Sequence, residues 1–118
     1  MIILYTKPIP INSKFGIFNG RNILTKKYRD TKCALALETR LKWHTEPLST
    51  PLAVTIRQYF GDKRKRDVDA YIKIILDSME GIVYENDCQI QRLVAEKFYD
   101  KENSRVEVEV VELSTDSE

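Results

Sequence analysis

The sequence predicts a small single-domain α+β fold, in which a mixed β-sheet and two main helices form two layers. The chain has 118 residues, of which 42% are hydrophobic and 31% are charged, a composition suited to one compact core. Two segments combine helical apolar spacing with an absence of proline, and four others are rich in β-branched or aromatic residues. We expect residues 1–113 to form the domain and the acidic residues 114–118 to be a disordered tail.

The N-terminal region begins with a short predicted strand. Ile2 to Tyr5 is an apolar run, and Pro8 and Pro10 end it because proline cannot continue a hydrogen-bonded ladder. The following segment, Phe15 to Ile23, contains two glycines and two asparagines, a composition that favours a surface turn or a flexible loop.

The first predicted helix extends from about Thr25 to Trp43, with Thr25 as its N-cap. Helical spacing of apolar residues predicts its buried stripe, which we expect to consist of Leu24, Tyr28, Ala34, Leu37 and Leu41. The outer face is basic and is either a ridge for a polyanion or a solvated surface; it carries Lys26, Lys27, Arg29, Lys32, Arg40 and Lys42.

The middle of the chain contains a predicted strand, a basic loop and the second helix. Leu52 to Phe60 has the composition of a strand, and Lys63-Arg64-Lys65-Arg66 forms the loop. Either Asp67 or Asp69 can cap a helix that continues to about Glu80 and ends at Gly81.

The C-terminal region predicts two more strands, Gln89 to Phe98 and Arg105 to Leu113. A polar turn at residues 100–103 joins them, so we expect the two strands to pair with each other. Alternation of valine with glutamate in the second strand is typical of a half-buried strand.

Charge is divided unequally along the chain. Residues 1–66 carry 14 Lys/Arg against 4 Asp/Glu, whereas residues 67–118 carry 5 against 14. A phosphodiester enzyme could use such halves, since cations hold a polyanion and carboxylates hold a metal. A solvated, salt-bridged surface is the plainer interpretation of charge alone.

The cysteines and the N-terminus bear on location. Cys33 and Cys88 have neither a CxxC partner nor a His/Cys cluster nearby, so we expect free thiols and no zinc site. With no secretion signal or membrane-spanning run in the sequence, we expect a cytoplasmic protein, either cellular or encoded by a phage and acting in its host.

The second helix has two chemically different faces. Ile72, Ile75, Leu76 and Met79 follow helical spacing and should be buried, while Asp69, Lys73 and Asp77 form a charged stripe. Such a stripe is also an ordinary set of ion pairs. Asp67 at the helix entrance and the acidic Glu85-Asn86-Asp87 after the helix raise the odds of a site, because Mg²⁺ prefers several carboxylate oxygens and retains water.

These residues resemble the RusA family of Holliday-junction resolvases. The resemblance lies in Arg66-Asp67-Val68-Asp69 with Lys73, then Leu76-Asp77, Gly81, and Glu85 to Ile90, and it covers residues 64–97 well. Two positions depart from the family pattern: Ala70 stands where the family has asparagine, and Asn86 replaces the first acid of an aspartate pair.

The resemblance implies roles for individual residues. Asp67, Asp69 and Asp87 resemble the catalytic metal-binding carboxylates, and Lys73 resembles the catalytic lysine. Asp77 and Gln89 resemble supporting positions, and Asp77 could instead order Lys73. The residues expected to contact DNA are Lys26, Lys27, Lys63, Arg64, Lys65 and Arg66.

The resemblance also implies a function: hydrolysis of four-way DNA junctions in recombination and repair, with Mg²⁺, or Mn²⁺ in its place, as cofactor. A junction is cut in two opposed strands and one chain supplies one site, so we expect a homodimer. Two alternatives remain open: a catalytically inactive module that binds branched DNA, and an enzyme of small phosphate substrates, which the basic surface disfavours.

Overall fold

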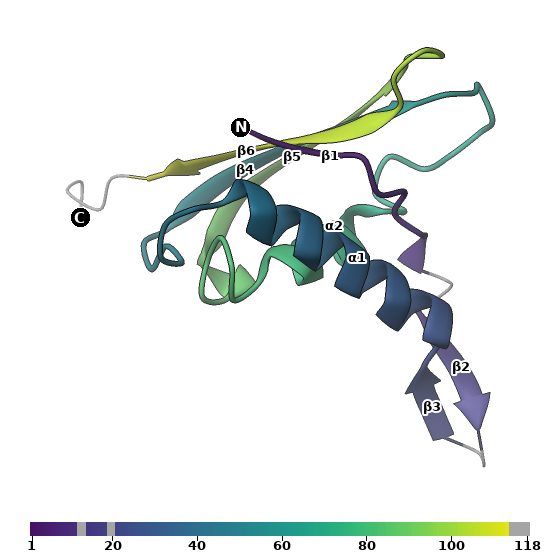
Figure 1. Cartoon of the computed structure of the whole chain (residues 1–118), viewed down its shortest axis with the longest axis horizontal. Helices are drawn as coiled ribbons and strands as arrows, with labels where there is room; N and C mark the ends of the chain where they lie inside the picture. Colours follow the sequence, from purple (N-terminus) through teal and green to yellow (C-terminus); the bar gives the residue numbers. More distant parts are fainter. Residues whose placement is uncertain (12–13, 19–20, 114–118) are drawn as a thin grey trace.

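The computed structural model describes residues 1–11, 14–18 and 21–113. A four-stranded sheet with the order β1-β6-β4-β5 has both helices on one of its faces, and the small β2–β3 hairpin projects from the end of α1 (Figure 1). The predicted α+β class is confirmed. The elements are β1 (Ile2–Leu4), β2 (Phe15–Phe18), β3 (Arg21–Leu24), α1 (Lys26–Lys42), β4 (Leu52–Phe60), α2 (Ile72–Met79), the 3₁₀ turn η2 (Asp87–Gln89), β5 (Ile90–Tyr99) and β6 (Arg105–Glu112).

Strand β4 is the centre of the sheet. It pairs in parallel with β5 and antiparallel with β6, which makes the sheet mixed. Alternate β4 residues are fully buried toward the helices, and the other set lies on the open face, because successive strand residues point to opposite sides. The buried set is Leu52, Val54, Ile56 and Gln58.

The prediction that the two C-terminal strands pair with each other is wrong. Both strands exist, but β4 lies between them, so β5 and β6 each pair with β4 instead. The pairing is decided by packing of the whole domain and not by the local sequence. Alternate valines of β6 face the helices, and β4 buries its own apolar face with a neighbouring strand on each edge.

Helix α2 supplies much of the core. Ile72, Ile75 and Met79 are buried as the apolar spacing predicts, whereas Leu76 is only half-buried. Ile74 is buried as well. The helix begins at Ile72, after a turn over residues 68–71, and not at Asp67 or Asp69 as expected. Past its C-cap, Gly81 has a φ of 82°, a left-handed conformation that favours glycine at this position.

Helix α1 has the predicted bounds and N-cap, because the Thr25 hydroxyl accepts a hydrogen bond from the Tyr28 amide. Its predicted buried stripe is confirmed at Tyr28 and wrong at Leu37 and Leu41. Tyr28, Leu35 and Thr39 are the buried residues, whereas Leu37 and Leu41 are 64% and 75% exposed. At about 100° per residue, Leu37 lies on the side of the helix opposite Tyr28, so only one of these stripes can face α2.

Phe15 to Ile23 was expected to be irregular, but β2 and β3 form an antiparallel hairpin there. The sequence Asn19-Gly20, a dipeptide typical of tight hairpin turns, is a signal from which this pairing could have been predicted. The predicted disordered tail, residues 114–118, lies outside the described residues. Within the described part of the chain, neither helix has the length and apolar character needed to cross a bilayer.

Candidate active site

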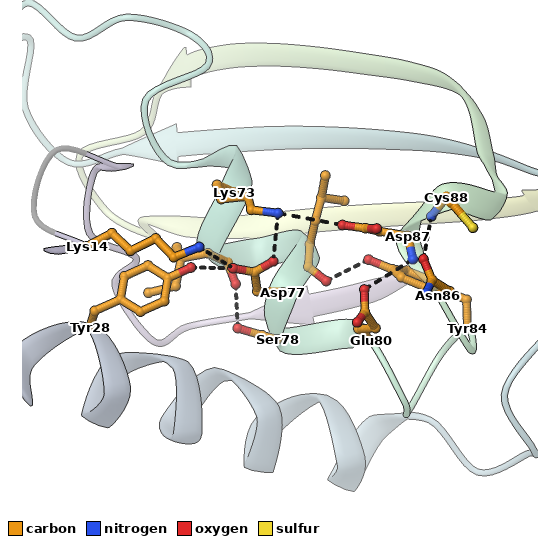
Figure 2. Close-up of polar contacts among 12 residues, drawn as sticks. Lys14, Tyr28, Lys73, Asp77, Ser78, Glu80, Tyr84, Asn86, Asp87 and Cys88 are labelled. Atoms are coloured by element: carbon orange, nitrogen blue, oxygen red, sulfur yellow. Dashed lines mark hydrogen bonds and ion pairs between the residues drawn. The ribbon is translucent and has the colours of Figure 1, made fainter. Parts of the chain in front are cut away.

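One lysine and two aspartates meet where α2 faces the turn before β5. The Lys73 ammonium lies 3.1 Å from Asp77 Oδ1, one helical turn along α2, and 3.6 Å from Asp87 Oδ2 of η2 (Figure 2). The Lys73 side chain is 43% exposed and that of Asp87 is 34% exposed, so both can be reached from solvent. The structure therefore joins three residues that are separate in the sequence into one ion-paired group.

Asp77 is held from its other side by residues of the N-terminal half (Figure 2). The buried Tyr28 of α1 donates a short hydrogen bond from its hydroxyl to Asp77 Oδ2. The ammonium of Lys14 lies 3.6 Å from the same oxygen and about equally close to the Phe15 and Tyr28 rings, 5.2 and 5.3 Å from their centroids. Asp77 thus links α1 to α2 as well as orienting Lys73.

These contacts set the charges of the group. Burial alone would raise the pKa of Asp77, but the Tyr28 hydrogen bond and the ion pairs with Lys73 and Lys14 outweigh it and lower the pKa. The hydrogen bond to Asp77 raises the pKa of Lys73, with Asp87 adding to the effect. Burial, followed by the bond to Asp77, raises the pKa of Tyr28. Both carboxylates therefore favour the protonated, cationic form of Lys73.

The turn that presents Asp87 is fixed by its own hydrogen bonds. The Asn86 side chain accepts from the Cys88 amide, and the Gln89 side chain accepts from the Asn86 amide, which together form a capping box. Gln89 also donates to the carbonyls of Leu48 and Thr50 at 2.9 and 3.0 Å. Gln89 thus ties the turn to the segment before β4, and Asn86, although it departs from the family pattern, caps the turn.

Asp67 and Asp69 are placed differently from Asp87. Both are exposed, and they lie at the turn before α2, where their carbonyls accept from the amides of Ala70 and Ile72. Among residues 1–11, 14–18 and 21–113, no three His, Cys, Asp or Glu side chains are grouped closely enough to hold a metal ion. The carboxylates have the chemistry that Mg²⁺ prefers, but their grouping in this structure does not form a complete site.

The basic loop lies close to this turn. Lys63, Arg64 and Lys65 are exposed, whereas Arg66 is half-buried and paired with Asp62 at 2.8 Å. That pairing, with the Arg64 amide, holds the pKa of Asp62 at about 2. On α1, Lys26 and Lys27 are also exposed. All five cations are exposed, although Arg64 also lies 3.6 Å from Asp62 and Lys63 lies over the Tyr99 ring.

A family model for endodeoxyribonuclease RusA matches residues 7–111 of the chain. The chain belongs to the RusA family. No curated protein matches it. Membership implies Holliday-junction endonuclease activity, and it makes branched DNA the substrate class of the chain.

The candidate site contains three residues that the sequence did not point to. Lys14 and Tyr28 reach Asp77 from far along the chain, and the Glu80 carboxylate accepts from the Asp87 amide at 3.1 Å. No spacing rule predicts the first two, because their contacts depend on how α1 packs on α2. Glu80 could have been found, since it is the last acid before the Gly81 turn that leads to Asp87.

Proposed function

We propose that this RusA-family chain resolves four-way DNA junctions by Mg²⁺-dependent hydrolysis of phosphodiester bonds, in recombination and repair, as a homodimer. Asp67, Asp69 and Asp87 are the proposed metal ligands, and Lys73 is the proposed electrostatic catalyst. Bound Mg²⁺, or Mn²⁺, would supply an activated water and offset charge on the phosphate.

The observation that carries this proposal is the position of Lys73 between two carboxylates, 3.1 Å from Asp77 and 3.6 Å from Asp87. Asp77 holds the Lys73 ammonium in position, and the Tyr28 hydroxyl and Lys14 in turn hold Asp77. A fixed cation stabilises negative charge that develops on a phosphate during attack more than it stabilises the starting ester. Asp87 shares Lys73 and is half-exposed, so its carboxylate can exchange that ion pair for another cation.

DNA binding is assigned to the exposed lysines and arginines on two surfaces. Lys63, Arg64 and Lys65 lie in the loop that leads to Asp67, and Lys26 and Lys27 lie at the start of α1. Phosphate contacts from these cations would hold the junction without reading its sequence. Two opposed cuts require two sites, which a two-fold dimer provides.

The test is cleavage of a synthetic four-way junction with a mobile centre, with and without Mg²⁺. We expect paired, symmetric nicks that require Mg²⁺, and a loss of at least about 100-fold in rate for Lys73→Ala and for Asp69→Asn with binding retained. Asp30→Asn is the matched control, because Asp30 is an exposed aspartate of α1 outside the proposed site.

A second readout tests the metal ligands without relying on activity. Binding of Mn²⁺, followed by electron paramagnetic resonance, should weaken in Asp87→Asn and stay unchanged in Asp30→Asn. Tight junction binding with no nicks from the wild type would contradict the proposal and would favour a binding module. Unchanged Mn²⁺ binding in Asp87→Asn would remove Asp87 from the ligand set.

A further inference from the structure

Strand β5 leaves one long edge of the sheet open. It has ten residues, and among the described residues β4 is its only strand neighbour. An open edge presents unpaired backbone amides and carbonyls, and it pairs readily with another strand unless something blocks it. At the other end of the sheet, β1 has only three residues, so β5 is by far the longer free edge.

The side chains of β5 protect this edge only in part, because exposed apolar residues lie among the charged Arg92, Glu96 and Lys97. Four large apolar or aromatic residues are exposed, namely Leu93 (45%), Val94 (39%), Phe98 (41%) and Tyr99 (46%). They come from both faces of the strand, because Leu93 is paired with the buried-side Val54 and Val94 is paired with Thr55. No proline interrupts the strand, and its one irregularity lies at the start, between Ile90 and Arg92. Such a strand is suited to a partner strand.

The sequence of β5 is complementary to itself in an antiparallel arrangement. If a two-fold axis passes through Val94, Arg92 of one copy lies opposite Glu96 of the other, and this ion pair forms twice. Leu93 then lies opposite Ala95, so apolar residues meet on the other face. Opposite charges directly across an antiparallel pair are stabilising. Moving the axis to either neighbouring residue places Arg92 opposite Val94 or Phe98, so the complementarity selects one register.

The flanks of the strand show the same complementarity. Glu85 and Asp87 precede β5, whereas exposed Lys97 lies near its end, where Lys63 of the basic loop covers the Tyr99 ring at 4.9 Å. Antiparallel pairing places the start of one strand beside the end of the other. The acidic flank of each copy would therefore adjoin the basic flank of its partner.

We infer that a second copy of this chain binds along β5, with the two strands antiparallel about Val94 and one sheet continuing through both copies. The inference specifies the surface of the dimer and rests on the dimeric state in the proposed function. The inference places the contact between the two copies at the open edge of the sheet. It does not place the contact at the exposed face of α1 that carries Leu37 and Leu41.

Charge reversal tests the interface in the full-length chain by sedimentation equilibrium. Arg92→Glu and Glu96→Arg each place like charges opposite one another twice, and each should weaken the dimer on the order of tenfold. The double variant restores opposite charges only if the two residues face each other across the copies, so its dimer should regain near wild-type affinity. Thermal unfolding of each variant establishes that the fold is retained, since Glu96 also pairs with Arg57 at 3.7 Å.

A disulfide tests the register. In a Cys33→Ser/Cys88→Ser background, which removes both exposed free thiols, Val94→Cys should form a cross-linked dimer under mild oxidation. Val111→Cys is the matched control: it is a 55% exposed valine on β6, away from the proposed axis, and should stay monomeric on a non-reducing gel. Leu37→Lys on α1 should leave the dimer unchanged.

Several outcomes would overturn this inference. These are a monomeric wild type, a dimer insensitive to both single reversals, a double variant as weak as the singles, or a dimer broken by Leu37→Lys alone. Junction nicking by the same preparations separates this failure from failure of the function. If the wild type nicks junctions but does not pair along β5, the proposed nuclease activity is unaffected and only the interface is wrong. If it forms the β5 dimer without nicking junctions, only the proposed nuclease activity is wrong.

Discussion

The two helices bury different kinds of residues against the core. On α2, the apolar residues face the core, while the charged residues Lys73 and Asp77 lie on another side, where Asp77 meets Tyr28 of α1. On α1, two leucines face solvent, while the buried set includes a tyrosine and a threonine. The Thr39 hydroxyl donates to the Leu35 carbonyl at 2.8 Å, which satisfies it without a tertiary partner. Apolar spacing therefore locates a buried face only when a helix has a single apolar stripe.

The largest expected effect is on stability, and it distinguishes a substitution on the buried face of α2 from one on the exposed face of α1. Ile75 is fully buried and Leu37 is 64% exposed. Ile75→Ala should lower the free energy of unfolding by about 2–5 kcal/mol, because it leaves a cavity in the core. Leu37→Ala should change it by less than about 0.5 kcal/mol. Urea unfolding of both variants measures this contrast, and similar losses would show that the two faces have been assigned wrongly.

A smaller effect is expected where the two helices meet. Tyr28→Phe removes the hydroxyl that donates to Asp77 and leaves a partly buried carboxylate with one partner fewer. We expect a loss of about 1–3 kcal/mol in the free energy of unfolding. A double-mutant cycle with Asp77→Ala, which leaves no acceptor for the Tyr28 hydroxyl, should show coupling between the two positions, since each single change removes the same bond. Additive losses would mean that the bond contributes nothing to stability.

The smallest expected effect is the loss of the stabilising contribution of Asp77 at low pH. The pKa of Asp77 is lowered in the folded chain, so its contribution to stability is present above the unfolded pKa, near 4, and is lost as pH falls through the folded value. The stability difference between wild type and Asp77→Asn should therefore shrink as pH is lowered from about 6 to about 3. Thermal unfolding across this range measures it. A difference that grows toward low pH would contradict the direction of the shift.

Local patterns in the sequence were enough to predict much of the fold. The bounds of α1 and β4 and the end of α2 at Gly81 follow from caps, glycine and residue composition, which act over a few residues. The partners of β5 and β6 do not follow from them. Their connection is short enough for a hairpin, and only the need of β4 for two neighbours separates them.

The candidate site divides in the same way. The i, i+4 pair of Lys73 and Asp77 follows from helical geometry, and its contact with Asp87 follows from the short connection after α2. The contacts of Lys14 and Tyr28 with Asp77 could not be predicted, because they depend on which side of α1 packs on α2. Packing against the rest of the domain decides which side of α1 is buried, because the α1 sequence has an apolar stripe on each of two sides.

The pairing of β1 has a consequence for how the chain folds. Residues Ile2–Leu4 form the first strand, yet among the described residues their only strand partner is β6, through pairs such as Leu4 with Val106. The β1–β6 pairing therefore joins residues near the two ends of the described chain. It is the pairing with the greatest sequence separation in the sheet. Such long-range closure slows folding, because its entropy must be lost before its contacts form. During synthesis, β1 has no strand to join until β6 has left the ribosome, so sheet closure and the seating of Ile2 and Leu4 in the core are late events.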